Sequence, residues 1–534
     1  MSKLKTIRAI CAAALAAATA LAAASCNSSG GESDPGGQTG SGLDKTFTMA
    51  MVADPGALDP ALGVSSSLNQ FSSFAYDTLV NLARSGDVLS GLATAWEQEA
   101  DKVIFTIKEG VTCSDGSTFT AQTAAGNINF VADPENASPL LGVTVPVGAT
   151  AEAEGSTLTL NLASPSPFVL SSLTDLYMVC DAGLADRSTL VSATNGTGPY
   201  VLEDLVPNDH YTYKVRPEYA WGPDGAATAG SDMPGTVVVR VIENETTAAN
   251  LLTSKEINAA VIRGADADRM EAAGLASQVT LAVAGEQWYN HGEGHLTADP
   301  AVRDALAQAV DLTELGQVLT SGKGSPPTLF TILDPAPCTG SVVAENLPVH
   351  SVESAGAVLD AAGWVVGADG IRAKDGTALK LSFVYNSGLG APGSAAAELA
   401  VAAWAAVGIQ VEPQQISDDQ LLPVLFGTGE WDVAWVTLHL VSPDQLVPFV
   451  SGAGLAEGGQ NFSEIDNAAY DALAAEAMGE MGAAGCPAWL EGQAELTKAN
   501  DVTLFVNNAT KMYLQGAEMS DFTTHLPTSI KMTD

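Results

Sequence analysis

The chain has 534 residues and a formal net charge of −40, from 62 Asp and Glu against 22 Lys and Arg. This length is too great for a single hydrophobic core, so two or three globular units are expected. The acidity argues against nucleic-acid binding and against a cleft that clamps phosphates or several carboxylates. We interpret it as a means of solubility, with selection of cationic ligands by the surface as the alternative.

The beginning of the chain has the pattern of a secretory signal. Lys3, Lys5 and Arg8 form a basic region, and residues 9–24 are apolar and rich in alanine. This run is too short and too weakly hydrophobic for a stable membrane-spanning helix, and no other segment approaches ~18 uninterrupted apolar residues. Residues 27–43, rich in Ser, Gly and Asp, are typical of a flexible tether.

The next part of the chain is dominated by strand signals. Alternating apolar residues predict strands over residues 47–52, 103–108, 157–162, 211–215 and 236–242. Thr120 precedes a run rich in alanine and glutamine, as the N-cap of a helix does. A helix is predicted over 244–252, followed by a short strand over 257–262.

From about residue 286, predicted helices alternate with predicted strands. The helices cover 301–309, 352–362 and 395–406, and the strands cover 379–385, 411–415 and 433–438. This alternation indicates α/β layers with parallel strand pairing. Trp404, on an alanine-rich helix, is expected in the core.

Six cysteines are present, of which Cys11 falls in the signal. Cys113, Cys180, Cys338 and Cys486 form an even set in an oxidising compartment, and the sequence alone allows three pairings. None has C-x-x-C spacing, which disfavours a zinc or redox role.

No catalytic motif is found: the chain lacks a G-x-S-x-G elbow, an H-E-x-x-H helix and a Walker A loop. His291 and His295 have a spacing suited to metal ligands, but the glycines between them argue against a helix, so we interpret the segment as a surface turn. We therefore predict no enzyme, no metal and no cofactor. A secreted hydrolase or adhesin is the remote alternative.

Residues 91–130, GLATAWEQEADKVIFTIKEGVTCSDGSTFTAQTAAGNINF, are the most informative segment. Eight further segments carry recognisable short motifs, at residues 53–60, 130–139, 195–200 (NGTGPY), 216–222, 299–311, 361–376, 408–411 and 429–432. In content and in order, these nine segments resemble the family 5 extracellular solute-binding proteins, the peptide and nickel receptors of ABC importers. Each motif is degenerate, and their shared order makes the resemblance specific.

The resemblance implies an α/β, bilobal, type II periplasmic-binding-protein fold with an extra subdomain inserted in lobe one and a ligand held between the lobes. The expected division is a signal peptide (1–25), a lipidated tether (26–43), lobe I (44–78, 197–285 and 503–534), its inserted subdomain (79–196) and lobe II (286–502). The implied function is capture of a small solute, with peptide as the leading class, and its delivery to an ABC permease and ATPase complex. A sugar, a cationic solute or a metal chelate are the competing ligands. We expect a monomer on the extracellular face of the membrane, or in the periplasm, with no nucleic-acid partner.

Two expectations concern cysteines. Ala23-Ala-Ser-Cys26 resembles a bacterial lipobox, in which Cys26 receives the lipid, although Ala23 stands where such motifs usually have Leu. Ordinary signal cleavage and a free protein are the alternative. The architecture of the family favours the pairings Cys113–Cys180 and Cys338–Cys486.

The resemblance also implies ligand-facing positions. In the family's peptide receptors, an aspartate after the strand that is 433–438 here neutralises the amino terminus of the ligand. That aspartate falls on His439 or Val441, neither of which is a carboxylate, and Asp444 is the nearest acid. Because burying an ammonium group without a counter-charge costs several kcal/mol, peptides with a free amino terminus are in doubt. The expected ligand-facing residues are Gly63, Val64, Ser65, Leu140, Trp288, Trp435, Thr437, Leu438, His439 and Asp444.

Overall fold

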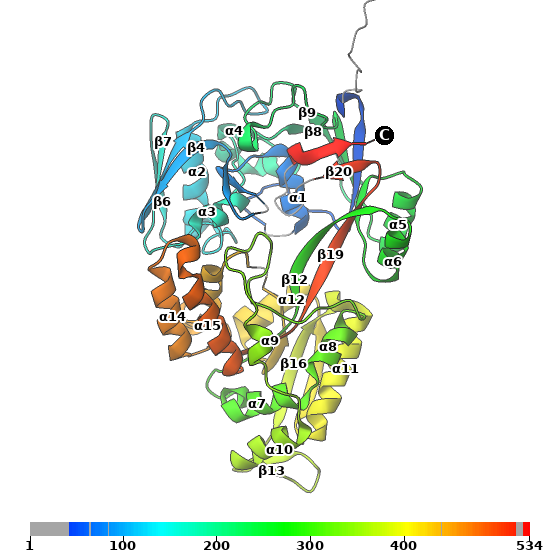
Figure 1. Cartoon of the computed structure of the whole chain (residues 1–534). Helices are drawn as coiled ribbons and strands as arrows, with labels where there is room; N and C mark the ends of the chain where they lie inside the picture. The colour runs from blue at the N-terminus through cyan, green and yellow to red at the C-terminus, as the bar shows by residue number, and fades with distance from the viewer. Residues whose placement is uncertain (1–41, 64–65, 84, 439, 520–526, 534) are drawn as a thin grey trace, which may run out of the picture. The chain divides into compact units, whose positions relative to one another are not determined.

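A mixed sheet organises the chain in the computed structural model, which describes residues 42–63, 66–83, 85–438, 440–519 and 527–533 (Figure 1). Its strand order among these residues is β17-β16-β18-β12-β19-β11-β1-β10-β9-β8. The strands are β1 Thr46–Met51, β8 Tyr200–Val206, β9 His210–Val215, β10 Thr236–Val241, β11 Ala259–Val261, β12 Ala276–Tyr289, β16 Lys380–Asn386, β17 Gln410–Ile416, β18 Val433–Trp435 and β19 Val502–Leu514.

The long strands β12 and β19 connect the two halves of this sheet. They pair antiparallel along nearly their whole length (Figure 1). At one end β19 also pairs with β11, over Met512–Leu514, and at the other end β12 pairs with β18, over Gln287–Tyr289. Between these two ends, the described residues flank the β12–β19 ribbon with one isolated bridge, formed by Ser325 and Asn507.

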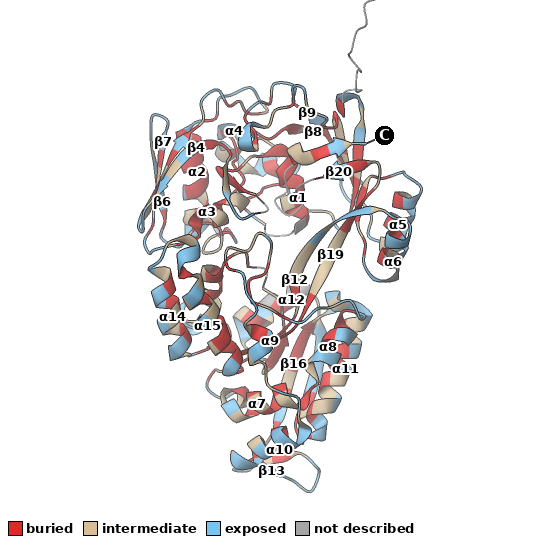
Figure 2. Ribbon diagram, viewed as in Figure 1, coloured by how far each residue is buried: buried red, intermediate tan, exposed pale blue. Residues whose placement is uncertain are grey.

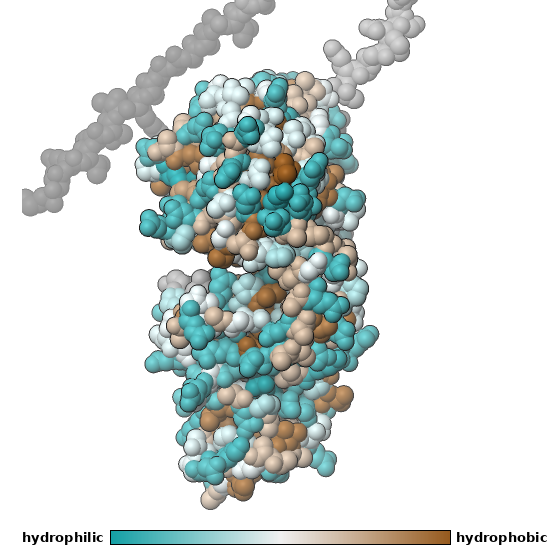
Figure 3. Space-filling model, turned by 90° about the vertical axis from the view of Figure 1, so that its left-hand side faces the viewer, coloured by the Kyte–Doolittle hydropathy of each residue, from teal (hydrophilic) through white to brown (hydrophobic). Residues whose placement is uncertain are grey.

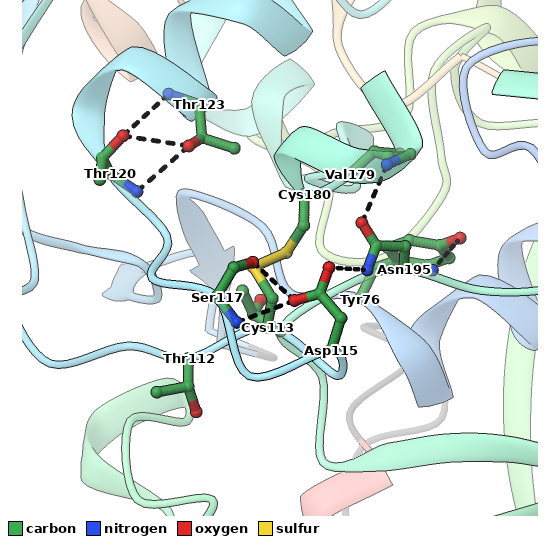
Figure 4. Close-up of a disulfide and its surroundings, with 12 residues drawn as sticks. Tyr76, Thr112, Cys113, Asp115, Ser117, Thr120, Thr123, Val179, Cys180 and Asn195 are labelled. Atoms are coloured by element: carbon green, nitrogen blue, oxygen red, sulfur yellow. Dashed lines mark hydrogen bonds between the residues drawn. A yellow bond between two sulfur atoms is a disulfide. The ribbon is translucent and has the colours of Figure 1, made fainter. Parts of the chain in front are cut away.

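A second, antiparallel sheet has the order β4-β5-β7-β6. Its strands are β4 Ala93–Gln98, β5 Lys102–Ile107, β6 Thr150–Glu154 and β7 Thr157–Asn161, and helix α2 (Ala121–Ala132) packs beside them. The helix begins where the sequence predicts, because the Thr120 side chain accepts a hydrogen bond from the backbone of Thr123 and the Thr123 hydroxyl accepts one from Thr120. Figure 4 shows this capping box.

Both disulfides have the pairing that the resemblance implies. Cys113 is joined to Cys180, and Cys338 is joined to Cys486. Figure 4 shows the first bridge beside Asp115, whose carboxylate accepts hydrogen bonds from Ser117 and Asn195. The bridge and these bonds fix the loop before α2 against the chain near residue 195.

The NGTGPY segment has a structural explanation in the buried side chain of Asp77. This carboxylate accepts hydrogen bonds from the Thr197 hydroxyl (2.9 Å), the Tyr219 hydroxyl (2.8 Å) and the Trp221 indole (3.1 Å). A Cβ on Gly196 would lie 2.3 Å from the Tyr76 ring, so the close approach of these two segments requires glycine at position 196.

Helices cover the sheet around β16. They are α7 Pro300–Ala309, α8 Leu312–Leu319, α10 Val352–Ala361 and α11 Gly390–Ala406, and their buried residues form one core with β16 to β18 (Figure 2). Trp404 is fully buried there and donates its indole N–H to the Leu306 carbonyl at 2.9 Å, which confirms its expected place in the core.

Shorter elements complete the described chain. They are α1 Ser66–Ala75, β2 Val80–Leu82, β3 Val88–Ser90, α3 Val169–Ser172, α4 Asp181–Ala185, α5 Glu245–Thr253, α6 Gly264–Ala272, α9 Val343–Asn346, β13 Val365–Val366, β14 Arg372–Lys374, β15 Thr377–Ala378, α12 Asp418–Pro423, α13 Val447–Val450, α14 Ala468–Met478, α15 Cys486–Lys498, β20 Ala517–Met519 and β21 Ile530–Met532.

The predicted strands and helices are largely confirmed, with two corrections. Parallel pairing holds for β16 with β17 and β18, but β12 and β19 are antiparallel to their neighbours. The strand predicted over 433–438 ends at Trp435. Hydrophobic areas on the face shown in Figure 3 are small and separated by polar residues.

Candidate functional site

A cavity of about 430 Å³ lies where β12 meets the end of β18. Its polar lining residues are Glu286, Asn386 and Thr437, and its aromatic ones are Trp435 and Phe505. An apolar wall with a few polar groups is typical of sites that bind small molecules, and the volume falls in their usual range.

A β-bulge in β12 forms one side of the cavity. The register with β19 shifts at Gly285 and again at Glu286. A Cβ on Gly285 would lie 2.3 Å from the ring of Phe505, so only glycine allows this close packing. The bulge thereby sets the direction of the next side chain, Glu286, which lines the cavity.

Trp435 forms an aromatic wall. Its ring lies 4.9 Å from that of Phe383 and 5.3 Å from that of Phe505, measured between centroids. Its indole N–H donates to Gln287 Oε1 at 2.9 Å. Packing on both sides and this hydrogen bond fix the ring, which gives a binding surface that loses little entropy when a ligand arrives.

The chain after Trp435 leaves the sheet because side chains of β12 take over its hydrogen bonds. The indole of Trp288 donates to the Val436 carbonyl at 3.0 Å, and the Leu438 amide donates to Glu286 Oε2 at 2.8 Å. This explains why the strand predicted to reach Leu438 stops three residues earlier.

Glu286 has an unusual electrostatic environment. Its side chain is 3% exposed, and burial raises its pKa from an ordinary 4.5 to about 8, although the Leu438 amide opposes that shift. Among the described residues, no Lys, Arg or His forms an ion pair with it. The acid is therefore mostly neutral at pH 7 in the absence of a ligand.

Asp444 lies in a different cavity of about 420 Å³, whose lining also includes Val143, Ser172 and Gln445. Its carboxylate accepts a hydrogen bond from the Ser442 hydroxyl. Burial raises its pKa, while the backbone amides of Asp444, Gln445 and Phe168 act in the opposite direction. Gln445 extends the contact by donating to the Val143 carbonyl at 2.9 Å.

The expected ligand-facing residues are thus divided. Trp435 and Thr437 line the first cavity, and Leu438 binds Glu286 through its backbone. Asp444 lies apart from them, Leu140 is 6% exposed within the core of the second sheet, and Trp288 is fully buried. Gly63 is partly exposed, while Val64, Ser65 and His439 lie outside the described residues. Ligand contact at all these positions stays a prediction.

The segment with His291 and His295 is a turn, as expected, but its histidines are partly buried instead of lying on the open surface. His295 accepts from the Asn290 amide at 3.2 Å and donates from Nδ1 to Asp432 at 3.0 Å. Burial lowers the pKa of His291 to about 3, so its ring is neutral. Over the described residues no group of three or more His, Cys, Asp and Glu side chains could hold a metal ion.

Sequence reasoning missed Glu286, Asn386 and Phe505. One signal was available: Glu286 follows a glycine inside an otherwise apolar strand, a combination typical of a bulge that carries a functional side chain. Within the described chain, no helix has the length and apolar character needed to cross a membrane.

Comparison with known proteins gives relatives over most of the chain. Protein XP55 of Streptomyces lividans is 26% identical over 367 residues, covering 65% of this chain and 63% of that protein. The match therefore spans less than two thirds of that relative's length.

Two solved structures resemble the fold. A substrate-binding protein of Microbacterium hydrocarbonoxydans, complexed with 4-hydroxybenzoate hydrazide, has a TM-score of 0.73 at 24% identity, covering 92% of this chain and 100% of that one. The oligopeptide-binding protein AppA of Bacillus subtilis, in complex with a nonapeptide, has a TM-score of 0.70 at 17% identity, with the same coverage. The fold is that of the type II periplasmic binding proteins.

The family described as bacterial extracellular solute-binding proteins, family 5 (middle), matches residues 87–452, which is more than half of the chain. The chain belongs to the family 5 extracellular solute-binding proteins.

Proposed function

We propose that this protein is the receptor of an ABC importer, which binds a small solute in the cavity beside β12 and hands it unaltered to a permease. The observation that carries the proposal is the position of that cavity, at the ribbon that joins the two halves of the main sheet. A ligand there contacts both the ribbon and the end of β18, so it can favour one arrangement of the halves over another.

The proposed lobes meet at this ribbon. Residues 44–78, 197–285 and 503–534 form lobe I, residues 79–196 are its inserted subdomain, and residues 286–502 form lobe II. The proposed boundary in β12 coincides with the bulge at Gly285. Among the described residues, the middle of the ribbon is flanked by the single bridge between Ser325 and Asn507, so bending there disturbs few hydrogen bonds outside the ribbon, which supports a hinge at this place.

Peptide is the leading ligand class, since the structural relative AppA was solved with a nonapeptide. The hydrazide bound by the other relative shows that this fold also accepts small aromatic solutes. A sugar, a cationic solute and a metal chelate remain the competing classes.

The N-terminal segment completes the proposal. Cys26 follows an apolar signal and precedes a polar tether, which is the arrangement of a lipid-anchored receptor. We expect the protein in the membrane fraction of its host, and Cys26→Ser to move it to the culture medium or the soluble fraction. Equal distribution of both forms would contradict the anchor.

The receptor function is tested by denaturing protein purified from its host and identifying the released solute by mass spectrometry. That solute is then titrated against unloaded protein. We expect saturable binding at micromolar concentration or below, with the ligand recovered intact. Conversion of the solute into a product would favour the hydrolase alternative.

A further inference from the structure

Glu286 lacks a partner that would explain a carboxylate at its position. Only one of its oxygens, Oε2, has a described hydrogen-bond donor, the Leu438 amide. A glutamine would accept the same bond without the cost of burying an acid. The role of the carboxylate must therefore lie with its second oxygen.

That second oxygen is accessible from the cavity. Glu286 is among the lining residues. Its Oε1 has no described hydrogen-bond donor, and this atom is not fully enclosed by the protein. A ligand atom that enters the cavity can therefore reach Oε1 directly.

The rest of the cavity suits a cation with an apolar body. Trp435 and Phe505 offer aromatic faces, which attract cations, and Thr437 and Asn386 supply neutral polar groups. Leu319, Leu389 and Leu421 complete an apolar wall. Among the described lining residues, Glu286 is the one ionisable group, so none of these residues offers a positive charge that competes with a cation.

The surrounding elements carry other titratable groups, but these are occupied elsewhere or do not line the cavity. Tyr289 on β12 bonds with Thr503 and Gln287, and Lys511 on β19 pairs with Glu271. Tyr385 on β16 and Glu314 on α8 do not line the cavity. His439 and the side chains of Asp418 and Asp419 lie outside the described residues.

We propose that Glu286 is the anionic anchor of the binding site and forms an ion pair with a protonated amine of the ligand. The inference rests on the proposed receptor function and narrows its ligand to solutes that carry an ammonium group. Glu286, on β12, also supplies a negative charge. In the family's peptide receptors that charge comes from an aspartate after the strand that is β18 here, at a position where this chain has His439 or Val441.

The anchor makes binding release a proton. Without ligand the acid is mostly protonated at pH 7, because its pKa is raised to about 8. The ion pair needs the ionised form, so each bound amine displaces nearly one proton at pH 7. Affinity then rises about tenfold per pH unit up to about pH 8. Above it, affinity for an alkyl diamine levels off, whereas affinity for peptides falls because their α-amino groups lose the proton.

The experiment uses matched probes whose only difference is the amine. Tripeptides to pentapeptides with free amino termini are compared with their N-acetylated forms, and 1,4-diaminobutane is compared with 1,4-butanediol. Calorimetry at pH 7 in two buffers of different ionisation enthalpy counts the released protons. Titrations at pH 6, 7 and 8 give the slope of affinity against pH.

The test variant is Glu286→Gln, which keeps an acceptor for the Leu438 amide. Its matched control is Glu314→Gln, which removes the same charge from an exposed position on α8. We expect Glu286→Gln to lose at least a hundredfold in affinity for the amine probes and to lose the pH slope, while Glu314→Gln behaves as wild type. Thermal melting of both variants checks that they fold.

Each outcome decides the matter. Equal affinity of wild type and Glu286→Gln for the amines, or binding without proton release, overturns the anchor. Binding of the acetylated or diol probes alone overturns the anchor but leaves the receptor function in place. If no probe binds and the solute recovered from the host has no amine, the anchor fails on that ground. Absence of any bound or binding solute counts against both proposals.

Discussion

Glu286 is buried and Asp444 is partly buried, and each carboxylate lines a cavity. They differ in the number of hydrogen-bond donors that the protein supplies in place of water. Asp444 accepts a hydrogen bond from the Ser442 hydroxyl and lies among backbone amides, those of Asp444, Gln445 and Phe168. Glu286 has one described donor, the Leu438 amide. Burial raises the pKa of both acids, but four donors oppose this shift at Asp444 and one opposes it at Glu286.

The difference follows from the elements that carry them. Asp444 comes directly after Pro443, at the start of a short helical turn where backbone amides are free to point at an anion. Glu286 stands in a strand whose amides are used by the sheet ladder, so no backbone donor from its own segment is available. A loop can solvate its own acid, whereas a strand must obtain donors from elsewhere or from a ligand.

The largest expected effect is on the pH dependence of stability at Glu286. The pKa of this acid is 4.5 ordinarily and about 8 in the folded protein, so the folded state binds more protons between these values. The free energy of unfolding of the wild type must therefore fall as the pH rises through this window, and Glu286→Gln removes the fall. We expect the ligand-free variant to exceed the wild type by about 5 kcal/mol at pH 9 and to equal it near pH 4.

Urea denaturation at pH 4, 7 and 9 measures this difference, with Glu314→Gln as the control for loss of a charge. Parallel stability curves of wild type and Glu286→Gln would show that the pKa of Glu286 is not raised in the folded protein. The contrast between the two carboxylates would then disappear.

The next effect tests the bulge that aims Glu286. Gly285→Ala puts a Cβ 2.3 Å from the Phe505 ring, which must move toward the cavity. We expect a loss of about 2–3 kcal/mol in the free energy of unfolding, together with weaker ligand binding. Gly427→Ala is the matched control, because a Cβ there meets no atom within 4 Å. Equal stability of the two variants would mean that the bulge is not packed as described.

Asp444→Asn tests the opposite carboxylate. An amide side chain has one acceptor oxygen, and its NH₂ group faces the donors that surround Asp444, so some amides lose their partner. We expect a loss of about 1–2 kcal/mol at pH 7, measured by urea denaturation, whereas Glu286→Gln gains stability at the same pH. Two changes of the same sign would refute the distinction between a solvated and an unsolvated acid.

Much of the fold was predictable from local patterns. The alternation in β5 and β9 and the cap at Thr120 are encoded within a few residues, because periodicity and capping are local. The end of β18 was not predictable in this way. It depends on Leu438 donating to Glu286, which lies 152 residues away in the sequence.

The site was predictable only in part. Trp435 and Thr437 follow from the resemblance because they flank a recognisable strand, and both line the cavity. Trp288 also follows from the resemblance, at the end of strand β12, but it is fully buried. Its indole donates a hydrogen bond to the Val436 carbonyl. Glu286 is one of 62 acidic residues, and its burial arises from strands and helices distant in sequence, which no local pattern reveals.

The smallest expected effect comes from removing one hydrogen-bond donor from Asp444, which brings its surroundings closer to those of Glu286. Ser442 is fully buried, and its hydroxyl donates to the Asp444 carboxylate. Ser442→Ala removes this donor, which raises the pKa of Asp444 further, because a hydrogen bond to the charged form lowers it. We expect a loss of about 1 kcal/mol at pH 7. The loss should shrink as the pH falls through the raised pKa of folded Asp444, because the protonated carboxyl no longer needs a donor to its charged form.

Denaturation of wild type and Ser442→Ala at pH 4 and pH 7 measures that dependence, and Ser451→Ala is a useful comparison. Ser451 donates in the same way to Asp471, at 2.6 Å, in the first turn of α14. A loss at Ser442 that is independent of pH would mean that the Ser442 hydroxyl does not act on the charge of Asp444, which leaves this role to the backbone amides. In that case its solvation would come entirely from the turn that begins at Pro443, and the distinction between loop and strand would be sharper still.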